Sequence, residues 1–224
     1  MYPRENTGYL SCALTPEDIA GYLETAEEIP AAVYLTNPDY LGNLLDLAAM
    51  AAVVHRYGTL LVVDNAHGAY LKFLTDSHHP MDLGADLCCD SAHKTLPVLT
   101  GGAYLHISGR FPEEIANQAK NAMALFGSTS PSYLILQSLD RANDYLESYR
   151  ETLMPFLAHV DALKRNLRKN GYSLSEKEPL KVTIAAKALS KTLSTAVAER
   201  TTAKLKRDSF HVAPEANADG HGHV

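Results

Sequence analysis

The sequence predicts an α/β fold with a mainly parallel sheet flanked by helices. Two short apolar runs, AAVYLT (31–36) and TLLVVD (59–64), have the composition and length of buried strands. The segment between them, about 43–57, is apolar over most of a helical circumference, and Gly58 is placed to follow its last turn. A strand, a helix and a strand in this order form a βαβ unit, which requires parallel strands joined by a right-handed crossover.

A helix is predicted ahead of this unit. The segment TPED (15–18) is typical of a helix start, because Thr caps free amides, Pro suits the first helical position and acidic residues favour the positive end of the dipole. The apolar residues that follow, including Ile19, Tyr22 and Leu23, share one face. We therefore expect an amphipathic helix with this face buried.

Two further strands are predicted after the unit, at ADLCCD (85–90) and GAYLHI (102–107). The intervening segment contains Pro97 and Gly101 and favours a loop. From Pro131 to about Lys169 the pattern is helical, with a break expected at Pro155. Gly171 is expected to close this helical region.

Composition favours a soluble globular protein that acts on small molecules. The chain has 224 residues, a net charge of -6 and 46% hydrophobic residues, without runs of Lys and Arg. This balance argues against nucleic acid or a membrane surface as the main partner. No apolar run approaches the roughly 18 residues of a membrane span, and the three cysteines fit a reducing compartment, so we expect a cytoplasmic protein. Cys88 and Cys89 are expected to be small buried side chains.

Polar groups follow two of the predicted strands, where ligands of open α/β sheets bind. Asp64 ends one strand, and Ser91-Ala92-His93-Lys94 follows another. Taken alone, Asp64 is as typical of a turn or a helix cap, and Lys94 of a solvated surface charge. Their shared position predicts that both segments line one crevice.

Four ordered segments carry a family resemblance. They are the D-x-A-H motif at 64–67, the S-x-H-K motif at 91–94, AVYLTNPDYLGNLLDLAAMAAVVHRYG (32–58) and FGSTSPSYLILQSLDRA (126–142). Together they resemble the pyridoxal-phosphate (PLP) binding core of the ornithine/lysine/arginine decarboxylase family, a fold-type I group. The resemblance runs in unbroken order from about Thr15 to Ala142.

The resemblance implies that pyridoxal 5'-phosphate is the cofactor and that Lys94 forms the Schiff base with it. Asp64 would pair with the pyridine nitrogen, and the protonated ring is the better electron sink. The other implied cofactor contacts are Ala66 on a ring face, His67 beside the cofactor, Ser91 and His93 on the phosphate, Thr36 and Asn37 near the 3′-oxygen, and Ser128, Thr129 and Ser130 on the phosphate of a neighbouring subunit.

The implied activity is decarboxylation of a basic amino acid, namely arginine, lysine or ornithine, by a homodimer without nucleic-acid or membrane partners. Two alternatives remain open: another fold-type I activity, such as an aminotransferase or a lyase, and a catalytically silent remnant. Family members are longer, so the chain is expected to be an N-terminally truncated member. It would then lack the glycine-containing phosphate loop of the family.

Three regions are expected along the chain. Residues 1–150 would form a partial PLP-binding large domain, and 151–206 a long-helix continuation with a partial small C-terminal domain. Residues 207–224 are expected to be a disordered tail because of their polar composition.

One cluster has metal-ligand residue types, namely Asp76, His78, His79 and Asp82. The spacing matches no strong metal-site pattern, and Pro80 lies within the segment. A solvated loop is therefore expected there, without a metal site.

Overall fold

The computed structural model describes residues 5–6, 9–10, 14–127, 130–174, 177–184 and 211–212. The chain divides into two compact units. The first, here called the sheet unit, comprises 14–39 and 45–154, and the second comprises 1–13, 40–44 and 155–224. Apart from residues 211–212, the expected disordered tail lies outside the described residues, as does all of 185–206.

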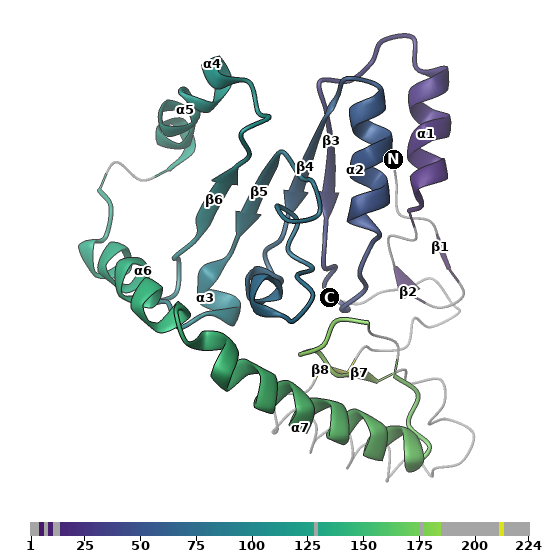
Figure 1. Ribbon diagram of the computed structural model, residues 1–224, viewed down its shortest axis with the longest axis vertical. Helices are drawn as coiled ribbons and strands as arrows, with labels where there is room; N and C mark the ends of the chain where they lie inside the picture. The colour runs from purple at the N-terminus through teal and green to yellow at the C-terminus, as the bar shows by residue number, and fades with distance from the viewer. Residues whose placement is uncertain are drawn as a thin grey trace, which may run out of the picture. The chain divides into compact units, whose positions relative to one another are not determined.

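The sheet unit is built on four strands in the order β3-β4-β5-β6 (Figure 1). Their bounds are β3 Ala32–Thr36, β4 Leu60–Asp64, β5 Leu87–Asp90 and β6 Tyr104–Ile107. Strands β3, β4 and β5 are parallel, whereas β6 pairs antiparallel with β5. The predicted α/β fold with a mainly parallel sheet is confirmed, and each of these strands lies within the range that the sequence predicted.

Helix α1, Pro16–Thr25, begins at the predicted residue. Thr15 and Asp18 form a capping box, in which the Asp18 amide donates to Thr15 Oγ1 at 3.2 Å and the Thr15 amide donates to Asp18 Oδ2 at 3.1 Å. Leu23 is buried, but Tyr22 is 56% exposed, so the expectation of a buried Tyr22 was wrong. The buried residues of α1 are Ile19 and Leu23, and Tyr22 lies outside this buried face.

Helix α2, Leu47–Arg56, is shorter than the predicted 43–57. It begins only after Asp46, whose carboxylate accepts the Ala49 amide at 3.1 Å. Its C-cap is Tyr57, and Gly58 follows with a φ of 68°, the left-handed conformation expected at this position. Helices α1 and α2 cover one face of the sheet, and the shared core contains Ile19, Leu23, Leu35, Leu47, Met50, Val54, Leu61 and Val63.

The two faces of the sheet differ in burial. Leu61 and Cys88 point to the face covered by α2 and are fully buried. The opposite face, here called the open face, carries Tyr34, Thr36, Asp64 and Cys89, which share it by register. Tyr34 is 64% exposed and Cys89 is exposed. The expectation that both cysteines are buried was wrong for Cys89, because successive strand residues alternate between faces.

The remaining described elements between residues 14 and 170 are helical. They are η1 Ala69–Phe73, α3 Ala92–Thr95, α4 Glu113–Ala116, α5 Ala119–Phe126, α6 Tyr133–Leu146 and α7 Tyr149–Lys169. The break expected at Pro155 was wrong, since α7 continues through it and the interruption lies at 147–148. Leu153 is buried and anchors the turn before the proline, which offsets the lost backbone hydrogen bond. Gly171 ends the helix as predicted, with a φ of 86°.

The second unit contains two small strand pairs. Strand β7, Thr183–Ile184, pairs parallel with β8, His211–Val212, and β1, Glu5–Asn6, pairs antiparallel with β2, Tyr9–Leu10. Lys164 is buried and donates to the carbonyl of Glu178 at 2.8 Å. Among the described residues, no helix has the length and apolar character needed to cross a membrane.

The core between α2 and the sheet predicts the response to truncation of Leu61. Leu61 is 0% exposed, so Leu61→Ala should lower the free energy of unfolding by about 2–5 kcal/mol through lost burial and a residual cavity. Leu99→Ala removes the same atoms from a side chain that is 52% exposed, so it should change the free energy of unfolding by less than about 0.5 kcal/mol. Urea denaturation measures both, and equal effects would contradict this assignment of the core.

Candidate active site

The two predicted motif segments converge at the carboxyl ends of β4 and β5. Asp64 is the last residue of β4, and its register partner in β5 is Cys89. Lys94 lies in α3, the single helical turn that follows β5, and its side chain is exposed. Lys94 Nζ is 3.4 Å from His67 Nε2, within reach of a hydrogen bond in which the ammonium donates. The segments 64–67 and 91–94 therefore meet in space.

Asp64 is held in a turn with both carboxylate oxygens engaged. Its Oδ1 accepts the Ala66 amide at 3.0 Å, and its Oδ2 accepts the Tyr34 hydroxyl at 3.2 Å. Burial and the negative charge of Asp64 together raise the pKa of Tyr34, which keeps the hydroxyl protonated as a donor. A carboxylate offers about four lone-pair sites, so these two donors leave capacity for another one. Asp64 is thus both a turn residue and a suitable partner for a protonated ring nitrogen.

Tyr34 was not among the predicted site residues. It lies in β3 two residues before Thr36, and therefore on the same face as Thr36 and Asp64. The period of two along β3 is the sequence signal that could have identified it.

The turn after Asp64 requires glycine at position 68. The Gly68 amide donates to the Asn65 carbonyl at 2.9 Å, which folds the turn tightly. A Cβ at Gly68 would lie 2.0 Å from Asn65 Oδ1 and 2.7 Å from Pro38 Cδ. A side chain here would therefore force its packed neighbours to shift.

Ser91 and His93 share the short turn of Lys94. The Lys94 amide donates to the Ser91 carbonyl at 3.0 Å, and the His93 amide donates to the Gly102 carbonyl at 3.2 Å. His93 Nδ1 is 3.1 Å from the same carbonyl oxygen. These bonds fix the turn that presents Lys94, and the contacts of Ser91 and His93 with a phosphate stay a prediction.

The remaining predicted site residues fall into three groups. Thr36 is exposed at the end of β3, and its register partner is Asp64. Asn37 is buried, and its side-chain oxygen accepts the Leu45 amide at 2.7 Å, so the structure gives it a role in shaping its own loop. Ser130 is exposed, whereas Ser128 and Thr129 lie outside the described residues.

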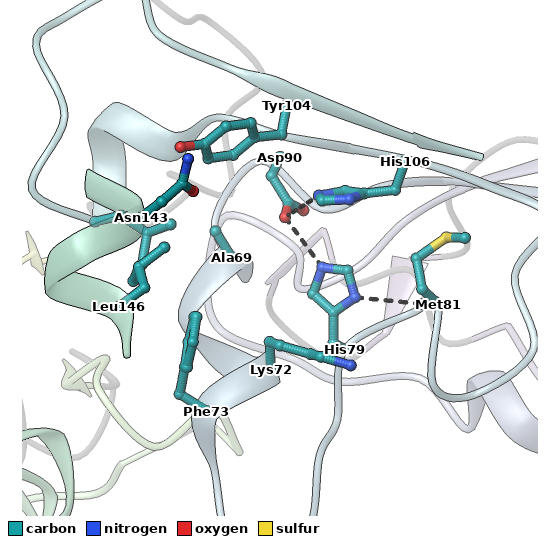
Figure 2. Close-up of a pocket in the computed structure, with 11 residues that line it drawn as sticks. Ala69, Lys72, Phe73, His79, Met81, Asp90, Tyr104, His106, Asn143 and Leu146 are labelled. Carbon is teal, nitrogen blue, oxygen red and sulfur yellow. Dashed lines mark hydrogen bonds and ion pairs between the residues drawn. The ribbon is translucent and has the colours of Figure 1, made fainter. Parts of the chain in front are cut away.

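The sequence analysis did not identify a cluster formed by His79, Asp90 and His106. His79 Nε2 and His106 Nε2 lie 3.0 Å and 2.9 Å from Asp90 Oδ2 (Figure 2). His79 is buried, so the expectation of a solvated loop was wrong for this residue. The signal was not readable along the chain, because the three residues come from a loop, from β5 and from β6. They line a cavity of about 270 Å³ together with Tyr104 and other residues.

Hydrogen bonding defines the chemistry of this cluster. Burial alone would raise the pKa of Asp90, but hydrogen bonds from His106 and His79 outweigh it and hold the pKa well below its usual range. His79 Nδ1 accepts the Met81 amide at 3.3 Å, so Nε2 carries the hydrogen and donates it to Asp90. The three ligand-type atoms lie within 4.8 Å of one another, as metal ligands would. However, Nε2 of His79 carries a hydrogen, so this nitrogen has no lone pair to offer a metal ion. The arrangement is a hydrogen-bonded carboxylate.

Comparison with known proteins identifies the family. Residues 12–217 match the family described as Orn/Lys/Arg decarboxylase, major domain. The chain belongs to this family. It is 35% identical over 171 residues to the uncharacterized protein YaaO of Bacillus subtilis, covering 71% of this chain and 35% of that protein. It is 28% identical over 148 residues to the arginine decarboxylase of Bacillus anthracis, covering 65% and 29%.

Solved structures place this Orn/Lys/Arg decarboxylase-family chain in the fold-type I group. An alanine–glyoxylate aminotransferase from Nostoc sp. superposes with a TM-score of 0.62 at 17% identity, covering 92% of this chain and 57% of that one. A Sphingomonas wittichii serine palmitoyltransferase gives 0.55 at 18% identity, covering 74% and 42%. At these identities the likeness concerns the fold. The chain spans about a third of the length of the curated relatives it matches.

The tight turn at Gly68 predicts opposite effects for two glycine substitutions. Gly68→Ala should lower the free energy of unfolding by about 1–3 kcal/mol, because the new Cβ overlaps Asn65, Pro38 and Leu71. Gly21→Ala is the matched control, since Gly21 lies within α1 with open space around its Cβ position. It should raise stability by about 0.5–1 kcal/mol. Thermal unfolding compares the two, and a neutral Gly68→Ala would contradict the close packing.

Proposed function

We propose that this chain binds PLP through a Schiff base at Lys94 and takes part in decarboxylation of a basic amino acid: arginine, lysine or ornithine. The observation that carries the proposal is the meeting of Lys94 with the Asp64–His67 turn at the ends of two parallel strands. Membership of the Orn/Lys/Arg decarboxylase family and the arginine decarboxylases among the relatives support the reaction type.

The residues of the site fit PLP. When bound, PLP supplies an electron sink for the electron pair left on the substrate Cα. Asp64 has acceptor capacity for the pyridine N–H, and its negative charge favours the protonated ring. Tyr34 donates to the same carboxylate and holds its orientation. His67 lies beside Lys94 Nζ, where it can accept a hydrogen bond from the lysine and orient it.

The other assignments belong to the same proposal. Ser91 and His93, in the turn of Lys94, would bind the phosphate, and Thr36 would lie near the 3′-oxygen. Ala66 would pack on a ring face. The segment with Ser130 would reach the phosphate of a second subunit.

We also propose a cytoplasmic homodimer. Helix α5 has no buried residue, and Phe126 at its end is 94% exposed. Tyr133 and Leu134 at the start of α6 are also exposed, so the segment 127–132 is flanked by apolar surface. Apolar surface of this kind marks interfaces. A second copy that covers it would bring Ser130 into an intersubunit position.

The central test is covalent capture of PLP. Incubation with PLP followed by borohydride should fix the cofactor on the peptide that contains Lys94, as seen by mass spectrometry. Lys94→Ala should abolish the imine absorbance and the adduct, because no other described lysine lies in the 64–67 and 91–94 segments. Lys120→Ala, on the exposed surface of α5, is the control and should leave both unchanged.

Product analysis then distinguishes the activities. Release of CO₂ from arginine, lysine or ornithine supports the proposal, and its loss in Lys94→Ala should exceed about a thousandfold, as expected for a covalent catalytic group. A keto acid product would identify an aminotransferase instead. A folded chain that forms no PLP adduct would be a catalytically silent remnant.

The apolar surface at α5 and α6 predicts the oligomeric state. Phe126→Asp should shift the dimer towards monomer by at least about tenfold in dissociation constant, because a charge would be desolvated in the interface. Tyr22→Asp on the exposed side of α1 is the control and should not change the mass measured by light scattering. A wild-type monomer at micromolar concentration would rule out this dimer.

A further inference from the structure

A single buried carboxylate joins the two segments of the candidate active site from behind. Asn65 directly follows Asp64, and Asp90 directly precedes Ser91. Asn65 Nδ2 donates to Asp90 Oδ1 at 2.7 Å, and the Asn65 amide donates to the Cys89 carbonyl at 2.9 Å. Asn65 is 0% exposed and Asp90 is 3% exposed. The link between the D-x-A-H and S-x-H-K segments is therefore shielded from water.

Asp90 is itself held from several directions. Its Oδ2 accepts hydrogen bonds from His79 in the loop before β5 and from His106 in β6 (Figure 2). Its Oδ1 accepts from Asn65 and from the Cys88 thiol at 3.5 Å. Four donors fill the acceptor capacity of the carboxylate, which leaves it one orientation. These contacts of Asp90 thus hold the carboxylate in place from four directions.

The hydrogen-bonded network around Asp90 is not the arrangement that would stabilise the folded state most. A buried carboxylate network is often no more stable than apolar side chains of the same volume. In addition, Asn65 Oδ1 is buried and has no hydrogen-bond partner within the described part of the chain. An unsatisfied buried oxygen destabilises the folded state. Fixed geometry between the two loops is the property that this network provides and that apolar packing would not.

We propose that Asp90 is a positioning residue that locks the Asp64–His67 turn to the Ser91–Lys94 turn, so that Asp64 and Lys94 engage PLP simultaneously. The inference rests on the proposed function. Asp64 and Lys94 would contact opposite ends of one rigid ring system, so a small shift of either turn breaks one contact. Groups that act together on one ligand need support that holds them within about 0.5 Å.

The chain offers a matched control in Asp86. It lies four residues before Asp90 and is likewise buried, with Oδ2 accepting from His55 Nε2 at 2.7 Å and from the Leu61 amide at 2.9 Å. Asp86 precedes β5, at the end of the strand away from Lys94. Asp86 Oδ1 also lies 3.4 Å from Arg110 Nε. Asp90→Asn and Asp86→Asn thus each remove a carboxylate charge from a buried position, and only Asp90→Asn touches the link.

The test compares these variants in the full chain. Both should lower the melting temperature, which reports their shared structural role. Only Asp90→Asn should raise amide hydrogen exchange in both 64–68 and 91–95 without PLP, by at least about tenfold, and weaken PLP binding by about tenfold or more. Asn65→Ala removes the side-chain hydrogen bond of the link while leaving both histidines on Asp90. It should reproduce these two effects with a smaller loss of melting temperature.

The outcomes separate the inference from the proposed function. A wild-type chain that captures no PLP would overturn the proposed function, whereas hydrogen exchange would still decide whether Asp90 couples the two turns. If Asp90→Asn and Asp86→Asn change exchange in the two turns and PLP affinity equally, the positioning role is wrong. Exchange that rises in only one turn would also overturn it.

Discussion

Parallel pairing of β4 with β5 is the constraint on which the candidate site depends. Because the strands run in the same direction, the residues that follow them emerge at the same edge of the sheet. The register places Asp64 opposite Cys89, and the next five residues lead to Lys94. An antiparallel pairing would put one segment at the opposite edge. The meeting of Lys94 with His67 at 3.4 Å is thus a consequence of strand direction before it is one of side-chain chemistry.

The two faces of the sheet have different roles. The face covered by α1 and α2 holds the apolar core and, beyond Cys88, the buried Asp90. The open face carries Asp64 and the Tyr34 hydroxyl that donates to it. Alternation along each strand makes this division possible, since Asp90 and Cys89 are neighbours in sequence but point to opposite faces. Chemistry on one face can therefore be supported by a network on the other.

Much of this arrangement was predictable because it depends on local patterns. The start of α1 at Thr15, the end of α2 at Gly58 and the strand bearing Asp64 follow from capping, backbone conformation and apolar runs. The break predicted at Pro155 was wrong, because burial of Leu153 sustains the helix around the proline. The cluster around Asp90 was not predictable, because its histidines lie 11 and 16 residues away in sequence and meet only when β5 pairs with β6. Local sequence patterns therefore identify the motif residues, whereas the residues that support them come together only in the folded sheet.

Binding of one ligand by both loops requires more than the presence of a lysine and an aspartate. Asp64 is oriented by the Ala66 amide and the Tyr34 hydroxyl, and Lys94 by the turn anchored on Gly102. Each anchor fixes one residue within its own loop, but neither fixes the separation of the loops. Besides the exposed contact of Lys94 with His67, the buried Asn65–Asp90 hydrogen bond and the bond from the Asn65 amide to the Cys89 carbonyl cross between them. A ligand held at both ends is sensitive to that separation, so the crossing contacts should contribute to binding in addition to the groups that touch the ligand.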